Sequence, residues 1–167
     1  IVNLFPLMPG EKINATLVVK DFVDDKYIFM ATSRGTVKKT PLSDFSNPRK
    51  NGIIAIKLDN GDYLIGAEIT NGNNDIVLVS DGGKAVWFDE NDVRSMGRNA
   101  RGVRGMKIPD ENQALSLLIA NSEIESVLVA TENGYGKRTV LSDFRKSGRG
   151  TQGVKAIQVS DRNGIVV

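Results

Sequence analysis

The chain repeats itself at intervals of about fifty residues. Three glycines that each follow a short apolar run, Gly35, Gly83 and Gly134, lie 48 and 51 residues apart. The segment V-K-K-T-P-L-S-D-F, which ends at Phe45, returns as G-K-R-T-V-L-S-D-F, which ends at Phe144. A period of this length is typical of solenoids and propellers, because each unit must stack on a neighbour to bury its apolar face.

The period divides the chain into consecutive units of one partial domain that spans residues 1–167. The units are 1–26, which is a half repeat, 27–75, 76–125 and 126–167, which is incomplete. The first unit is a half repeat because Ile1–Leu17 resembles Ile53–Ile69 with one inserted residue. The chain therefore opens and closes within a repeat, and we expect about three blades of a larger ring.

Each complete unit predicts four short strands. In the second unit, Ile28–Thr32 and Thr36–Lys39 flank a turn at Gly35, and Ile53–Leu58 and Tyr63–Thr70 flank an Asn-Gly turn. An Asn-Gly pair between apolar runs is the strongest short hairpin signal. The strand segments are rich in valine and isoleucine and mostly alternate. We therefore predict an all-β fold of four-stranded antiparallel blades around an axis, since a β-sandwich would not need a fifty-residue self-match.

Helical structure is expected only as single turns. No window of eleven or more residues has sustained helical spacing. Leu42–Phe45 and Leu141–Phe144 follow predicted strands and contain serine and aspartate, so each is predicted as one helical turn.

The residue types exclude most catalytic chemistry. The chain has no cysteine and no histidine, which excludes disulfides, thiolate or imidazole metal ligands, and Ser-His or Cys-His catalysis. The Gly134–Thr139 segment lacks the spacing of a phosphate-binding loop. We predict no catalytic residue, no metal site and no cofactor in this segment. No apolar run of eighteen residues and no leader are present, so neither a membrane span nor secretion is expected.

Basic residues are concentrated in three windows at the repeat spacing. Residues 34–57, 94–107 and 137–155 hold 17 of the 22 lysines and arginines, and their only acids are Asp44 and Asp143. One such cluster would be read as a solvated loop, but three at equivalent repeat positions predict a continuous cationic track. Such a track suits a polyanion with regular charge spacing, and duplex DNA carries a phosphate every ~1.7 Å of axis.

The expected mode of binding is to the phosphate backbone. No segment resembles a recognition helix for the major groove, so base readout is not expected. With three tyrosines, six phenylalanines and one tryptophan, the chain has few aromatics for stacking bases, which disfavours RNA or single strands. A propeller that binds a protein partner is the alternative from another functional class.

Several long motifs resemble one known family. They are I-V-N-L at the start, G-R-N-A-R-G-V-R-G-M-K, N-G-Y-G-K-R-T and S-D-R-N-G-I-V-V at the end. Together they make the whole chain similar to the C-terminal domain of the bacterial DNA gyrase A subunit. That resemblance implies a β-pinwheel, a propeller variant whose blades exchange strands, and a non-catalytic module that wraps duplex DNA around its outer rim to support negative supercoiling. The equivalent domain of topoisomerase IV is the alternative within the class.

The resemblance also implies the contact residues and the partners. By position, the expected rim contacts are Lys38, Lys39, Arg49, Lys50, Arg98, Arg101, Arg104, Lys137, Arg138 and Arg149. The family's hallmark glutamine-containing basic box is not in this segment. The implied partners are duplex DNA, the rest of the gyrase A subunit, and the gyrase B subunit in an A2B2 holoenzyme that binds ATP and Mg²⁺ elsewhere. The implied location is the bacterial cytoplasm, on the chromosome.

Overall fold

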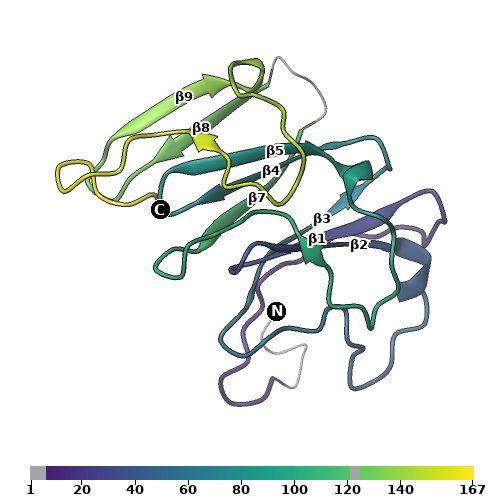
Figure 1. Cartoon of the computed structure of the whole chain (residues 1–167). Coiled ribbons are helices and arrows are strands. Elements are labelled where there is room, and N and C mark those ends of the chain that lie inside the picture. Colours follow the sequence, from purple (N-terminus) through teal and green to yellow (C-terminus); the bar gives the residue numbers. More distant parts are fainter. Residues whose placement is uncertain (1–6, 121–124) are drawn as a thin grey trace.

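Three antiparallel sheets follow one another along the chain (Figure 1). The computed structural model describes residues 7–120 and 125–167. The strand order is β3-β1-β2-β6 in the first sheet, β10-β5-β4-β7 in the second and β8-β9 in the third. The strands are β1 (Tyr27–Thr32), β2 (Thr36–Pro41), β3 (Leu64–Thr70), β4 (Asp75–Ser80), β5 (Lys84–Asp89), β6 (Val103–Arg104), β7 (Ala114–Ala120), β8 (Ser126–Ala130), β9 (Gly136–Val140) and β10 (Val154–Lys155). The predicted all-β, antiparallel architecture is confirmed.

The sequence period is also the structural period. Gly35, Gly83 and Gly134 lie at the hairpin turns with φ of 78°, 73° and 80°. This left-handed backbone favours glycine because a Cβ atom would crowd the carbonyl group. Each glycine N–H donates to the carbonyl oxygen three residues earlier, at Thr32, Ser80 and Thr131. The three hairpins are therefore copies of one unit.

Neighbouring repeats exchange a strand. β6 belongs to the repeat 76–125 but pairs with β2 of the repeat 27–75, and β10 of the repeat 126–167 pairs with β5 of the repeat 76–125. The turn glycines take part in the exchange. The carbonyl of Gly35 accepts from the N–H groups of Gly105 and Met106, and the carbonyl of Gly83 accepts from those of Ala156 and Ile157. Each of the first two sheets thus has four strands only because the next repeat supplies the fourth.

The hydrophobic core lies between the sheets. On β4, Ile76 and Leu78 pack in a cluster shared with the first sheet, whereas Val77 and Val79 pack in a cluster shared with the third. The middle sheet is therefore buried on both faces. In the third sheet Val127 and Val129 are buried while Leu128 between them is 72% exposed, which is the period of two expected of a strand with one covered face.

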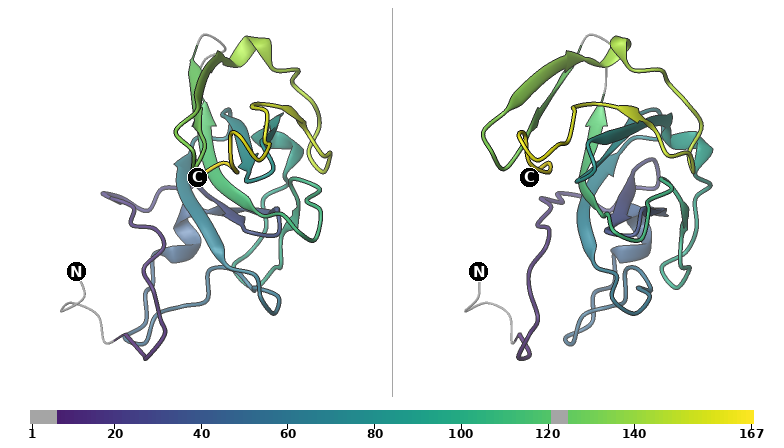
Figure 2. Two further views of the ribbon diagram at one scale, coloured as in Figure 1. Left: turned by 90° about the vertical axis from the view of Figure 1, so that its left-hand side faces the viewer. Right: turned by 60° about the vertical axis from the view of Figure 1, so that its left-hand side comes forward.

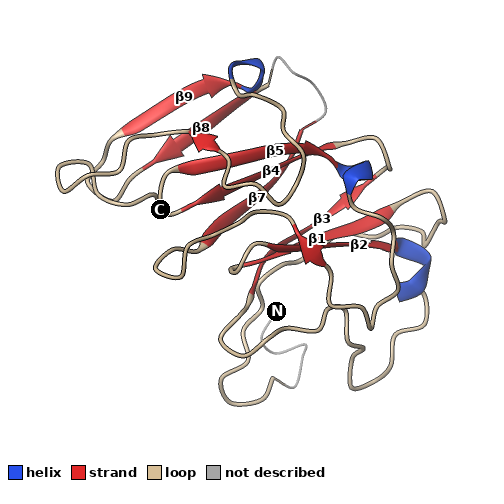
Figure 3. Cartoon of the chain, in the orientation of Figure 1, coloured by secondary structure: helices blue, strands red, loops and turns tan. Residues whose placement is uncertain are grey.

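Across residues 7–120 and 125–167, helical structure is limited to single 3-10 turns after the hairpins, drawn in blue in Figure 3. These are η2 (Leu42–Phe45), η3 (Glu90–Asp92) and η4 (Leu141–Asp143). The two predicted helical turns are confirmed, the second ending one residue early. In the described residues, no helix is long and apolar enough to cross a membrane.

The predicted strand Ile53–Leu58 is not formed. Its repeat equivalents begin with β6 and β10, which pair with the hairpin of the preceding repeat. Residues 7–26 form no strand, as Figures 1 and 2 show for the purple segment outside the first sheet. Because residues 7–26 form no hairpin, residues 53–58 have no ladder to join among the described residues. The first six residues of the predicted half repeat lie outside the described part of the chain.

Candidate nucleic-acid interface

Three equivalent loops carry much of the basic charge. We call residues 46–52 basic loop 1, residues 94–102 basic loop 2 and residues 145–153 basic loop 3. Each follows a 3-10 turn, and basic loops 2 and 3 lead into the strands β6 and β10 that pair with the hairpin of the preceding repeat. Arg98 and Arg149 hold corresponding positions, each four residues before the glycine that ends its loop, and Arg49 lies three residues before Gly52 in the shorter basic loop 1. The cationic groups are therefore placed by the repeat itself.

Basic loops 2 and 3 dock on the preceding sheet in the same way. The N–H of Met96 donates to the carbonyl of Lys39 on β2, at 2.9 Å, and the N–H of Ser147 donates to the carbonyl of Trp87 on β5, at 2.8 Å. Because both loops dock at the same repeat position, successive loops are carried along the same side of successive sheets.

Hydrogen bonds join basic loop 3 to the residues that flank basic loop 2. The N–H of Gly150 donates to the carbonyl of Gly105 at 2.6 Å, and the N–H of Lys107 donates to the carbonyl of Thr151 at 2.8 Å. The Arg149 guanidinium donates from Nε to the carbonyl of Asp92 at 2.8 Å and from Nη1 to that of Arg104 at 3.0 Å. Basic loop 3 is thus fixed to the chain on both sides of basic loop 2.

Most of the expected contact residues lie on the surface. Arg49, Lys50, Arg101, Arg104, Lys137, Arg138 and Arg149 are exposed, and Arg98 is half-buried. Among these eight, one ion pair is present in the described residues, from Arg101 Nη1 to Asp59 Oδ1 at 3.1 Å, with both side chains well exposed. An exposed pair of this kind is weak, so the positive charge of the loops remains available to an anion.

Lys38 and Lys39 lie in the interior and not on the rim where the sequence analysis placed them. They are 0% and 5% exposed. The Lys38 ammonium donates to the carbonyl of Ala55, at 2.7 Å, and to that of Arg98 in basic loop 2. Burial and the nearby Arg98 lower the pKa of Lys38 from its usual 10.5 to about 8, and Asp44 opposes the shift. Lys38 therefore ties basic loop 2 to the segment that follows basic loop 1.

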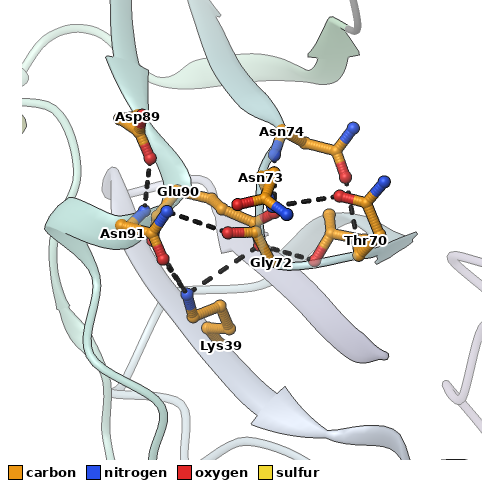
Figure 4. Close-up of polar contacts among 9 residues, drawn as sticks. Lys39, Thr70, Gly72, Asn73, Asn74, Asp89, Glu90 and Asn91 are labelled. Atoms are coloured by element: carbon orange, nitrogen blue, oxygen red, sulfur yellow. Dashed lines mark hydrogen bonds and ion pairs between the residues drawn. The ribbon is translucent and has the colours of Figure 1, made fainter. Parts of the chain in front are cut away.

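Lys39 belongs to a buried polar cluster between the first two sheets, shown in Figure 4. Its ammonium lies 3.9 Å from Glu90 Oε2 and donates to the Glu90 carbonyl at 3.2 Å and to Asn91 Oδ1 at 3.4 Å. The Glu90 carboxylate also accepts from the Thr70 hydroxyl and from the Asn74 N–H, each at 2.7 Å. A buried ammonium needs such partners, and here they hold two repeats together.

Four further basic side chains, which the expected set did not include, lie on the same surface. Arg94, Lys107, Arg145 and Lys155 are exposed. Lys155 on β10 holds the repeat position of Arg104 on β6, so aligning the repeats on Arg104 was the signal that could have found it. Lys155 and Arg145 line a groove of about 330 Å³ together with Lys137 and Arg138.

Comparison with known proteins assigns the family. A family model described as the DNA gyrase C-terminal domain, a β-propeller, matches residues 26–71, 74–121 and 125–167. The chain belongs to the DNA gyrase C-terminal domain family. The prediction of a propeller-type array from this family is therefore confirmed. In this chain, neighbouring repeats of the array exchange a strand.

The relatives of this gyrase-family chain are much longer than it is. Over all 167 residues it is 49% identical to the A subunit of DNA gyrase from Klebsiella oxytoca and 46% identical to that from Escherichia coli K12, covering 19% of each relative. It thus spans about a fifth of their length. A solved C-terminal domain of DNA topoisomerase IV aligns with a TM-score of 0.91 and 32% identity, covering 98% of this chain and 51% of that one. A solved DNA gyrase A C-terminal domain gives 0.86 and 31%, covering 99% and 55%.

Proposed function

We propose that the chain is the DNA-wrapping module of a DNA gyrase A subunit, and that duplex DNA runs along the three basic loops. The observation that carries this proposal is the shared docking of basic loops 2 and 3, through the N–H groups of Met96 and Ser147, on successive sheets. A row of cations set by a stacked repeat presents charge along a curved line. A duplex that follows this line must bend, and its phosphate contacts with the cations offset the free-energy cost of bending.

The energetics require several contacts. Smoothly bending a 20–30 base-pair site by 40–90° costs about 1–6 kcal/mol. Arginine and lysine side chains on successive loops offset that cost by neutralising phosphates and releasing counterions. The contacts we propose are Arg49, Lys50, Arg98, Arg101, Arg104, Lys137, Arg138 and Arg149, without the two buried lysines. The described helical turns have three or four residues, too short to read a major groove, so binding is independent of base sequence.

The larger assembly belongs to the same proposal. The rest of the gyrase A subunit, together with the gyrase B subunit, would supply DNA cleavage, and ATP and Mg²⁺ would bind outside this segment. The curated relatives are bacterial proteins, which supports a place on the chromosome in the bacterial cytoplasm. A topoisomerase IV domain is the second candidate, and the TM-score of 0.91 is the observation that favours it. The family model and the gyrase relatives favour gyrase.

Salt-dependent binding to a random-sequence duplex tests the proposal. If about six phosphates are neutralised, the logarithm of the binding constant falls against the logarithm of salt with a slope near −5. Changing Arg98, Arg101 and Arg104 together to Glu should reduce the slope by about 3 and weaken binding to all sequences. The matched control changes Lys12, Lys20 and Lys26 to Glu, because these exposed lysines lie outside the basic loops. A slope near zero, or equal losses in both triple variants, would refute the proposed track.

A further inference from the structure

One lysine of basic loop 3 is held by the sheet on which the loop docks. The Lys146 ammonium lies 2.5 Å from Asp75 Oδ1 on β4 and 3.9 Å from Asp89 Oδ2 on β5. It also lies 5.6 Å from the centroid of the Trp87 ring, within the range of a cation–π contact. The next residue, Ser147, donates its N–H to the Trp87 carbonyl. Side chain and backbone therefore fasten this part of the loop to β4 and β5.

The two aspartates that hold Lys146 face each other across the ladder of β4 and β5. Asp75 and Asp89 are direct cross-strand partners, and like charges in that arrangement destabilise a sheet. The Lys146 side chain is 42% exposed and that of Asp75 is 19% exposed, so water screens this ion pair less than a fully exposed one. The ammonium therefore offsets the repulsion between the carboxylates and ties them to the loop.

The equivalent place one repeat earlier has a different set of residues. At the positions of Asp75, Trp87, Asp89 and Lys146, the chain has Tyr27, Lys39, Pro41 and Ser95. Basic loop 2 nevertheless makes the same backbone contact, since the Met96 N–H donates to the Lys39 carbonyl. The loop lysine and the aspartate pair thus occur together at one loop and are replaced together at the other. This pattern indicates that they act as one unit, in addition to the backbone docking that both loops share.

We propose that Lys146 is a positioning residue, which fixes basic loop 3 on the sheet of β4 and β5 and does not itself neutralise a DNA phosphate. Two carboxylates already match its charge. The neighbouring Arg145 is exposed and forms no ion pair within residues 7–120 and 125–167, so its charge stays available to an anion. The part of this inference that concerns DNA rests on the proposed function, whereas the docking of the loop does not.

Lys146→Met removes the charge and keeps an unbranched side chain over Trp87. It leaves Asp75 and Asp89 facing each other without a cation, and it removes the ion pairs and the cation–π contact. The docking equilibrium of basic loop 3 should weaken about tenfold. Lys146→Arg should keep the docking, because a guanidinium has the same charge and can donate to both carboxylates. Asp75→Asn should weaken docking in the wild-type chain but add little in Lys146→Met, because the two residues act on each other.

Hydrogen exchange of the Ser147 amide measures this docking without DNA. The Met96 amide has the equivalent hydrogen bond in basic loop 2 and is the control within the same molecule. In Lys146→Met the protection factor of Ser147 should fall about tenfold while that of Met96 stays the same, and in Lys146→Arg most of the protection should return. Arg145→Gln, which removes the adjacent exposed charge, should leave Ser147 protected. Unchanged protection of Ser147 in Lys146→Met, or an equal loss at both amides, would overturn the proposal.

Salt-dependent binding to a random-sequence duplex separates positioning from phosphate contact. A lysine that neutralises a phosphate contributes about 0.9 to the slope of the logarithm of the binding constant against that of salt. Lys146→Met should therefore weaken binding at fixed salt, because a loosened loop must be ordered again on DNA, and should leave the slope unchanged. A slope reduced by about 1 would show a phosphate contact and overturn the proposal. If the wild-type chain binds no duplex, the proposed function fails, and the exchange of Ser147 still decides whether Lys146 fixes the loop.

Discussion

The Lys39–Glu90 pair gives the sharpest test of how the first two repeats are joined. Glu90 is fully buried at the first position of its 3-10 turn, where the other repeats have the buried Leu42 and Leu141. The three residues share one environment, since the backbone N–H of each donates to the carbonyl of the residue just before its hairpin. Glu90 donates to Asn74, Leu42 to Lys26 and Leu141 to Glu125. Leucine is therefore sterically suited to position 90, and Glu90→Leu isolates the effect of the carboxylate.

The magnitude follows from the partners that each change leaves behind. Glu90→Leu removes the carboxylate from Lys39 and also from the Thr70 hydroxyl and the Asn74 N–H. Breaking a buried ion pair from one side costs about 3–5 kcal/mol. Lys39→Met alone leaves a buried carboxylate with two neutral donors, so its cost should be similar. The double variant buries no charge. It still leaves the Thr70 hydroxyl and the Asn74 N–H without the Glu90 acceptor, which costs about 1–3 kcal/mol of unfolding free energy for each donor. The added apolar contacts of leucine and methionine offset part of this cost.

The expected result is strong non-additivity in urea unfolding. Each single variant should lose about 3–4 kcal/mol of unfolding free energy, while the double variant should lose about 2, giving a coupling energy above 3 kcal/mol. Glu90→Gln is the control, because it keeps an acceptor for Thr70 while removing the charge. If the two single losses simply add in the double variant, the pair is not coupled and the reasoning fails.

Four further predictions concern the basic loops and their supports. Lys38→Met should leave the salt slope of DNA binding unchanged, because Lys38 lies in the interior; a slope reduced by about 1 would mean that it contacts a phosphate. Since the pKa of Lys38 is lowered to about 8 in the fold, the unfolded chain binds more protons between pH 8 and 10.5. Stability should therefore rise over that range relative to Lys38→Met, and a falling difference in urea midpoints would contradict the burial. Gly153→Ala should lower the free energy of unfolding by more than about 2 kcal/mol, because its Cβ would overlap the Ala85 carbonyl. Gly134→Ala should lower it by about 1 kcal/mol, because Gly134 has a similar φ but no atom within 4 Å of a Cβ. Equal urea midpoints for the two variants would exclude the close approach at Gly153. Arg149→Ala should reduce the salt slope by about 1, and an unchanged slope would show that its two carbonyl contacts are its only role.

The hairpins could be predicted from the sequence because their signals are local. A short apolar run followed by a glycine turn defines the hairpin of β1 and β2 and recurs at the same period in β4 and β5. The fate of residues 53–58 could not be predicted in the same way. A strand is stable only with a partner, and this segment's partner would belong to a preceding repeat, so its apolar sequence alone does not make it a strand.

The positions of Lys38 and Lys39 show what charge patterning misses. Both lie in a basic window, and the equivalent Lys137 and Arg138 are exposed. The difference is that basic loop 2 and η3 cover β2, whereas nothing in the described chain covers the outer edge of β9. Counting charge along the chain cannot tell these cases apart, since burial is decided by the next repeat. The placement of the arginines of the loops, in contrast, follows from the period itself.

Wrapping of duplex DNA around the row of basic loops would change the topology of a closed DNA circle. A relaxed closed circle is bound by the chain, treated with a nicking-closing topoisomerase and deproteinised, and its topoisomers are then resolved. We expect a shift in linking number that grows with bound protein and disappears when Arg98, Arg101 and Arg104 are changed to Glu. Binding with an unshifted topoisomer distribution would contradict wrapping and leave only a straight contact between the loops and the duplex.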